Sequence, residues 1–266
     1  MTTALSQPPE LRTVALPKPR NMIAIASGKG GVGKTWLAIT LTHALSQMGR
    51  RALLFDGDLG LANVDIQLGL MPEHDLGGVL AGRLSLAHAT VPYAAGGFDI
   101  VAGRSGCGRL AAVPPSRIAL LGEELVLTAG RYDHVILDLG AGIERTVRQL
   151  TRLAGSCIVV TTDEPTSLTD AYAFIKLAQL EQVQVDVRII VNMASSQREG
   201  EKTFGALFRA CASFLQLSPQ LLGIVRRDVK VRESIRYQTP LLTRFPNADA
   251  ATDVKNIAAS IASLPS

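Results

Sequence analysis

The amino-acid sequence predicts one α/β domain, a mostly parallel, twisted sheet with helices on both faces. Short β-type runs that are apolar on both faces alternate with longer helical patterns, as in a sheet covered on both sides. After the first run, apolar residues recur at helical spacing on Leu37, Leu41, Leu45 and Met48. The 266 residues are enough for one large domain with a sizeable core.

The chain is expected to begin with a flexible leader, residues 1–20, followed by the domain, residues 21–266. Prolines in the leader block a regular helix, and few large apolar side chains offset the entropy of ordering. An amphipathic helix around residues 254–261 closes the sheet. The expected strands, in chain order, are Met22–Ala26, Arg51–Phe55, Phe98–Val101, His134–Leu137, Cys157–Thr161, Val187–Val191 and Leu222–Val225.

The composition argues against several classes of protein. The three cysteines lie far apart in the chain, so neither a zinc knuckle nor a disulfide framework is indicated, and a reducing cytoplasm fits best. No apolar run approaches the roughly 20 residues that cross a bilayer. The net charge of +4 is a small surplus of basic side chains, too small to indicate nucleic-acid binding by itself.

A glycine-rich loop joins the first expected strand to the next helix. The stretch Ser27–Thr35 matches the pattern Gly-x-x-x-x-Gly-Lys-Ser/Thr. Its glycines let successive N–H groups face a phosphate chain at a helix N-terminus, whose dipole favours anions. Lys34 is placed to reach the β- and γ-phosphates, and the Thr35 hydroxyl to coordinate Mg²⁺. We therefore expect nucleotide binding here, with a chance glycine-rich turn as the alternative.

Carboxylates follow two further strands. Asp56 and Asp58 flank one glycine at the end of the second strand, where ligands of α/β sheets bind; the alternative is that both cap the following turn. Asp138 ends an apolar strand, which is the Walker B arrangement that holds Mg²⁺ directly or through water. The glycines after Asp138 permit a loop that moves when the γ-phosphate leaves.

The sequence SGKGGVGKT resembles the deviant Walker A motif of the MinD/ParA family of ATPases. The resemblance covers nearly the whole domain and implies a P-loop fold that binds ATP and Mg²⁺. It implies that Lys29 reaches the partner's phosphates across a dimer interface, so that the chain is a monomer without ATP and a homodimer with it. The alternative for Lys29 is a solvated side chain. The resemblance also implies that Asp58 orients the attacking water and that Asp56 lies near the Mg²⁺ shell.

Further site residues follow from the same resemblance. Glu164 and Asp170 match acidic positions that face the partner subunit and pair with Lys29. The residues alone also allow a purely structural turn, in which Pro165 stops a helix and Ser167 or Thr169 caps the next one. The implied catalytic residues are Lys29, Lys34 and Asp58, and the implied metal ligands are Thr35, Asp56 and Asp138. The expected nucleotide-binding residues are Gly28, Lys29, Gly30, Gly31, Val32, Gly33, Lys34, Thr35, Trp36, Asn192, Arg227 and Asp228.

Three of the expected nucleotide-binding residues lie far from the glycine-rich loop in the sequence. Asn192 resembles the family's adenine-reading asparagine, whose amide both donates and accepts. Arg227 and Asp228 follow Arg226, which stands where the family usually has proline. The fluorescence of Trp36 is expected to report nucleotide entry, the alternative being an indole in the core.

Two stretches, residues 58–65 and 164–172, look most like the FlhG (FleN/YlxH) branch of the family, which regulates flagellar number and placement. This branch implies an FlhF-like GTPase and flagellar switch or regulator proteins as partners. It also implies a cytoplasmic protein that a partner recruits to the cell pole or membrane surface. The C-terminus lacks a bulky, basic amphipathic tail, so direct membrane binding is expected to be weak or absent.

Two other functions stay open. A partition or division-site ATPase would bind DNA or membrane, but clusters of basic residues are more often solvated faces, so DNA binding is not favoured. A regulatory scaffold with little turnover would not need Lys29, Thr35, Asp58 and Asp138 together. The basic clusters are Arg226, Arg227, Lys230, Arg232 and Arg236, and Arg145, Arg148 and Arg152.

Overall fold

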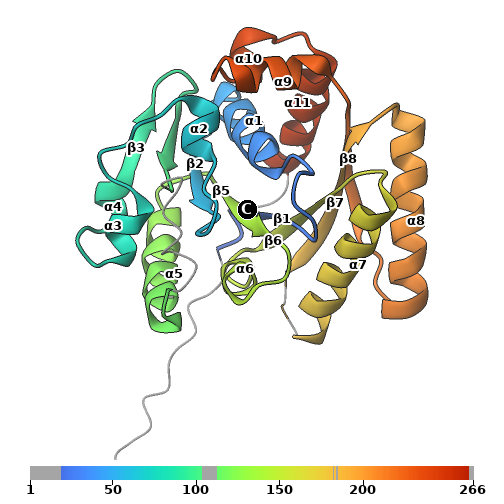
Figure 1. Cartoon of the computed structure of the whole chain (residues 1–266), viewed down its shortest axis with the longest axis horizontal. Helices are drawn as coiled ribbons and strands as arrows, with labels where there is room; N and C mark the ends of the chain where they lie inside the picture. The colour runs from blue at the N-terminus through green and yellow to red at the C-terminus, as the bar shows by residue number, and fades with distance from the viewer. Residues whose placement is uncertain (1–18, 104–112, 182, 184, 264–266) are drawn as a thin grey trace, which may run out of the picture.

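The apolar runs of the sequence form a central eight-stranded sheet between two layers of helices (Figure 1). This computed structural model describes residues 19–103, 113–181, 183 and 185–263, so most of the expected leader lies outside the described residues. The strand order is β3-β4-β2-β5-β1-β6-β7-β8. The strands are β1 (Met22–Ser27), β2 (Ala52–Gly57), β3 (Thr90–Tyr93), β4 (Phe98–Val101), β5 (His134–Ala141), β6 (Ser156–Thr161), β7 (Asp186–Ala194) and β8 (Gln220–Arg226).

All the strands except β3 run parallel to their neighbours. Every residue of β1 and β2 is buried, because both faces of these strands are covered by helices. The predicted mostly parallel α/β sheet and its seven expected strands are therefore confirmed. The sequence analysis did not expect β3, an antiparallel strand at the edge of the sheet.

One face of the sheet packs against α1 and α11, which also contact each other. Alternate strand residues such as Ile23, Ile25 and Leu54 point into this layer, together with Leu37 and Leu41 of α1. The helix expected at the end of the domain is α11, and it closes this layer as predicted. The helices of this face are α1 (Lys34–Gln47), α2 (Val64–Leu68), α9 (Val229–Arg236), α10 (Leu241–Arg244) and α11 (Asp249–Ala262).

The other face packs against the helices of the chain's middle part. The intervening strand residues, among them Ala24, Leu53 and Leu137, point into this second layer. The division of alternate residues between two cores follows the two-residue period of a strand covered on both sides. The helices of this face are α3 (Leu76–Leu80), α4 (Leu86–Ala89), α5 (Pro115–Ala129), α6 (Arg145–Thr151), α7 (Pro165–Leu180) and α8 (Gln197–Leu215).

The register of the parallel strands gathers polar residues at one edge of the sheet. β5 lies between β1 and β2, and its Asp138 is paired in register with Asp56 of β2. The loop that leaves β1 and the end of β6 lie beside them because β1 pairs with both β5 and β6. Ligands of open α/β sheets bind at such a carboxyl edge.

Candidate nucleotide-binding site

The glycine-rich loop leaves β1 at Ser27 and enters α1 at Lys34. Gly31 (φ 81°) and Gly33 (φ 86°) adopt the left-handed conformation that other residues rarely adopt. No side chain among the described residues caps α1, so the first N–H groups of this helix lack a side-chain partner. The loop therefore has the shape and the open helix terminus that a phosphate chain requires.

The loop is packed tightly against two elements of the domain. A Cβ atom on Gly28 would lie 2.1 Å from the Asp170 carbonyl oxygen in α7. A Cβ atom on Gly33 would lie 2.5 Å from Nδ2 of Asn192 in β7, and this amide also donates a hydrogen bond to the Val32 carbonyl (2.8 Å). These approaches fix the loop in position from both sides.

Asp138 is a buried carboxylate without a hydrogen-bond partner in the described part of the chain. Burial raises its pKa to about 7 and nearby Asp58 also raises it, whereas the Thr35 hydroxyl and the Lys34 ammonium lower it. Asp56 is likewise fully buried, and burial and Asp138 raise its pKa well above the ordinary range. Two neighbouring buried carboxylates of this kind are typical of a functional site.

The oxygen atoms at this edge fit a magnesium ion that arrives with a nucleotide. Mg²⁺ prefers a few carboxylate and hydroxyl oxygens and completes its shell with phosphate and water. Asp138 leaves both oxygens unpaired, and Thr35 lies at the start of α1 beside it. The described residues contain no group of three or more His, Cys, Asp or Glu side chains that could hold a metal alone.

Asp58 is half-buried and lies beside the loop that follows Asp138. Its Oδ1 accepts a hydrogen bond from the Leu61 N–H (2.9 Å), and a Cβ on Gly140 would lie 3.4 Å from the same oxygen. Asp56 accepts longer bonds from the backbone of Asp58 and Val64. Both carboxylates therefore stabilise the turn after β2, as the alternative interpretation expected, while lying at the candidate site.

Lys29 is bound within its own chain. Its Nζ donates to Oε2 of Glu164 (2.6 Å) and to the Thr166 hydroxyl (2.8 Å). This hydrogen bond lowers the pKa of Glu164, although the pair is exposed to solvent. Glu164 and Thr166 lie at the start of α7, so the ion pair joins the glycine-rich loop to that helix.

A model of the CobQ/CobB/MinD/ParA nucleotide binding domain family matches residues 23–241 of this sequence. The chain belongs to this family. The MinD/ParA resemblance inferred from the sequence is thus confirmed. The family binds nucleotides, which fits the loop and the carboxylates at the edge of the sheet.

Two relatives have names that refer to flagella or to an antiactivator. Antiactivator FleN of Pseudomonas aeruginosa is 37% identical over 247 residues, which cover 93% of this chain and 88% of that protein. The flagellum site-determining protein YlxH of Helicobacter pylori is 29% identical over 244 residues, covering 91% of this chain and 81% of YlxH.

Solved structures of MinD share the fold. The septum site-determining protein MinD of Pyrococcus horikoshii, complexed with Mg-ADP, has a TM-score of 0.77 at 25% identity, covering 91% of this chain and 95% of that one. In the described part of this MinD/ParA-family chain, no helix is both long enough and apolar enough to span a membrane.

The three residues of this MinD/ParA-family chain that were expected to contact the nucleotide base differ in burial and in hydrogen bonding. Asn192 is buried with its amide on Val32, and Arg227 is exposed with Nε near the Met193 carbonyl (3.4 Å). Asp228 caps α9 by accepting a hydrogen bond from the Lys230 N–H (2.8 Å). The structure brings Asn192 to the loop but gives Asp228 a structural role.

Arg226, which replaces the family's usual proline, joins β8 to α11. Its guanidinium pairs with the buried Asp253 through Nε (2.9 Å) and Nη2 (2.9 Å), and with Asp249 through Nη1 (2.9 Å). The Arg226 N–H also donates to Asp253 (2.9 Å). These bonds fix the start of the loop that carries Arg227.

Two expectations at this site need correction or restriction. Pro165 does not stop a helix; it begins α7, a position where its missing N–H costs nothing. Ser167 and Thr169 do not cap that helix, because the Ser167 hydroxyl accepts from the Thr162 N–H (3.0 Å) and Thr169 donates to the Pro165 carbonyl. The Trp36 indole is buried in the core, as the alternative interpretation expected.

Sequence reasoning missed two residues of the site. Met193 has a positive φ of 57° at an irregularity of β7, and its side chain lies against Gly33. Nothing in the sequence signals this backbone conformation, which is uncommon for a side chain of this size. Thr166 is the second partner of Lys29, and its place beside Glu164 in the acidic segment was the available signal.

Proposed function

We propose that this chain is an ATP-dependent dimerisation switch that hydrolyses ATP and regulates flagellar number or placement. The main support is the similarity to FleN over 93% of the chain, together with an unpaired buried Asp138 beside the phosphate-binding loop. The similarity to YlxH supports the same assignment. ATP and Mg²⁺ are the proposed ligands.

In this proposal, each of the candidate site residues at the carboxyl edge of the sheet has a separate role. The loop from Gly28 to Thr35 binds the phosphates, and Lys34 neutralises their charge. Thr35, Asp138 and Asp56 would hold Mg²⁺, which would supply positive charge against the charge that develops on the phosphate oxygens. Asp58 holds the attacking water in line by hydrogen bonding, which does not require a raised pKa. In this proposal Asn192 and Arg227 contact the base, which requires that the Asn192 amide give up its bond to the Val32 carbonyl.

Dimerisation would redirect Lys29. In the monomer Glu164 and Thr166 hold its ammonium group within the chain, so delivery to a partner's phosphates requires that these bonds break. The exchange costs little, because both side chains of this ion pair are exposed and water screens their attraction. A phosphate charge supplied by a second ATP-loaded subunit would compensate for the loss. Asp170 contacts Gly28 within the chain, and in this proposal it belongs to the same dimer interface.

Partner proteins complete the proposed function. A structure of the MinC:MinD cell division protein complex from Aquifex aeolicus is 26% identical to this chain, with a TM-score of 0.73 over 92% of it and 98% of that chain. It shows that a family member binds a protein partner. By analogy, an FlhF-like GTPase or a flagellar switch or regulator protein binds this chain in its ATP state. The protein would act in the cytoplasm, and such a partner would recruit it to the pole or membrane surface.

The basic clusters give little support to DNA binding. Arg226 is paired with Asp249 and Asp253, and Lys230 with Glu233. Arg148 and Arg152 both pair with Glu181 at the end of α7. These ion pairs reduce the positive charge available to a phosphate backbone.

Deletion of the gene in the source organism tests the assignment. We expect cells with an altered number or position of flagella by electron microscopy, restored by the wild-type gene but not by Lys34→Ala. The Lys176→Ala variant, which changes an exposed lysine of α7, should restore the phenotype and serves as the control. Normal flagella combined with a defect in chromosome partition or septum placement would favour the other branch of the family.

A further inference from the structure

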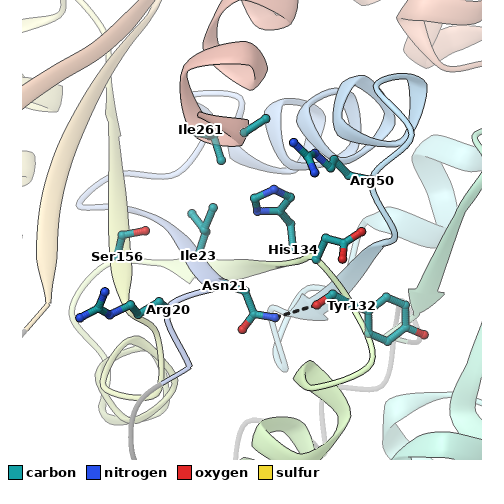
Figure 2. Close-up of a pocket in the computed structure, with 10 residues that line it drawn as sticks. Arg20, Asn21, Ile23, Arg50, Tyr132, His134, Ser156 and Ile261 are labelled. Carbon is teal, nitrogen blue, oxygen red and sulfur yellow. Dashed lines mark hydrogen bonds between the residues drawn. The ribbon is translucent and has the colours of Figure 1, made fainter. Parts of the chain in front are cut away.

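A cavity lies where β1, β5 and β6 begin, at the edge of the sheet opposite to the nucleotide site (Figure 2). Its volume of about 530 Å³ falls within the range of roughly 300–1,000 Å³ that small-molecule sites occupy. Ile23 of β1 forms part of one wall, and Ile261 and Ala262 at the end of α11 form part of another. The cavity therefore offers apolar surface to a ligand.

Donor groups accompany this apolar surface. Figure 2 shows Arg50 and His134 beside the end of α11, with Arg20 and Ser156 on the other side of the cavity. Nδ1 of His134 is buried and has no hydrogen-bond partner among the residues that the structure describes. Burial and the charge of Arg50 lower the pKa of His134, and the charge of Asp133 raises it. Within the described chain, neither Arg20 nor Arg50 forms an ion pair at salt-bridge distance, although the charge of Arg50 contributes to lowering the pKa of Asp133.

The charge balance favours an anion over a cation. Asp133 is the acidic side chain among the described lining residues, and it is already paired with Arg51. Asp133 accepts from the Arg51 N–H (2.8 Å) and from the Arg51 guanidinium (3.0 Å), and these bonds lower its pKa. A cation would thus find no free carboxylate here, whereas an anion would find two unpaired guanidinium groups.

The walls of the cavity are held in place by other bonds. Nδ2 of Asn21 donates to the carbonyls of Ala129 (2.8 Å) and Tyr132 (2.9 Å), which joins the start of β1 to the end of α5. The Tyr132 hydroxyl donates to Asp99 (2.7 Å) on β4. The scaffold is therefore formed before a ligand arrives, and mainly the long side chains of Arg20 and Arg50 remain to be ordered.

We propose that this cavity binds a small organic anion, in which a phosphate or carboxylate group is attached to an apolar body. The anionic group binds Arg50 and His134, with Arg20 and the Ser156 hydroxyl opposite. The apolar body packs against Ile23 and Ile261. This site is separate from the nucleotide edge and does not depend on the flagellar assignment.

A titration of the full chain with phenyl phosphate, followed by NMR of the imidazole rings, tests the proposal. The sequence has four histidines, so the ring signals are few enough to resolve. We expect the His134 signals to shift with saturation in the millimolar range, while those of His43 and His88 stay unchanged. Inorganic phosphate should bind more weakly and phenol not measurably. The amides of Gly31 and Gly33 report whether the probe also occupies the phosphate-binding loop, and shifts confined to those amides would overturn the proposal.

Two arginine variants locate the anionic group. Arg50→Ala and Arg20→Ala should each weaken phenyl phosphate binding by up to about tenfold, the scale of one charge-assisted contact. Arg209→Ala, which removes an exposed arginine on α8, is the matched control and should bind as the wild type does. Both arginines are exposed, so their removal should leave the thermal unfolding temperature nearly unchanged. Unaltered binding in both cavity variants would contradict the proposed site.

Discussion

At the scale of single residues, the candidate site is defined by charges that the fold alone does not satisfy. Asp138 and Asp56 are buried next to each other in register, and burial raises the pKa of both. Such an arrangement destabilises the empty protein and is retained because a ligand compensates it. The motif predicted the positions of these residues, whereas the lack of a hydrogen-bond partner for Asp138 among the described residues depends on packing that no local pattern reveals.

The Asp138→Asn substitution should stabilise the protein free of metal and nucleotide. The pKa of Asp138 is raised from 3.8 to about 7 on folding, so the folded state loses stability as the pH rises between these values and the unfolded carboxylate ionises first. We expect Asp138→Asn to be more stable than the wild type by at least about 1 kcal/mol near pH 8, with the difference shrinking near pH 5. Urea unfolding in the presence of a chelator measures this. A difference that does not vary with pH would contradict the burial argument.

The Lys29→Ala substitution should separate binding from turnover. Lys29 contacts Glu164 and Thr166 on the surface, so its removal should change the free energy of unfolding by less than about 1 kcal/mol. Nucleotide affinity should persist, while ATP turnover should fall by about 100-fold or more, since a charge supplied in trans is lost. A steady-state phosphate-release assay with Lys176→Ala as the control checks this. Turnover equal to that of the wild type would remove Lys29 from catalysis.

At the scale of elements, the sequence predicted the interior strands better than the edges. The runs that became β1, β2, β5 and β6 are apolar on both faces, so burial and pattern agree. β3 was missed because it is a half-buried edge strand that contains Pro92. Such a strand is neither buried on both faces nor marked by an uninterrupted apolar run. β5 and β7 extend past their expected ends to Ala141 and Ala194, because Asp138 still pairs with Ile25 of β1 and Ala194 with Arg226 of β8.

The contact between the glycine-rich loop and α7 also could not be predicted from the sequence. Proline was read as the end of a helix, but Pro165 fills the first turn of α7, which then packs against Gly28. The contact between the glycine-rich loop and α7 could not be inferred from the sequence, because the two segments lie far apart along the chain. Only the paired strands β1 and β6 bring them together.

A methyl group on Gly28 should therefore disturb both elements. Its Cβ would lie 2.1 Å from the Asp170 carbonyl oxygen, a backbone atom that cannot move alone. We expect Gly28→Ala to lower the free energy of unfolding by about 1–3 kcal/mol, the usual cost of overpacking. Gly30→Ala is the matched control, because its Cβ would meet only the Ala141 methyl at 4.0 Å. Equal thermal unfolding temperatures for the two variants would show that the contact is not rigid.

At the scale of the whole molecule, the topology brings the loop after β1, the ends of β2 and β5, and Asn192 of β7 to one edge of one sheet. This convergence could be predicted, because motif residues followed apolar strands in an α/β pattern. The cavity at the opposite edge could not, because it depends on how the end of α11 meets the starts of β1 and β5. The clustered arginines give little support to a DNA-binding surface, because local ion pairs such as Arg226 with Asp253 neutralise part of their charge.

The central claim is that ATP joins two copies of this chain and that hydrolysis separates them. The sharpest test is the Asp58→Ala variant, because Asp58 contacts the turn after β2 and the loop after β5, and the proposed mechanism gives it a role in positioning water and none in binding phosphate. Sedimentation velocity with Mg²⁺ and ATP should show a stable dimer of this variant, and the same variant with ADP should sediment as a monomer. A monomeric Asp58→Ala protein at saturating ATP would contradict the account.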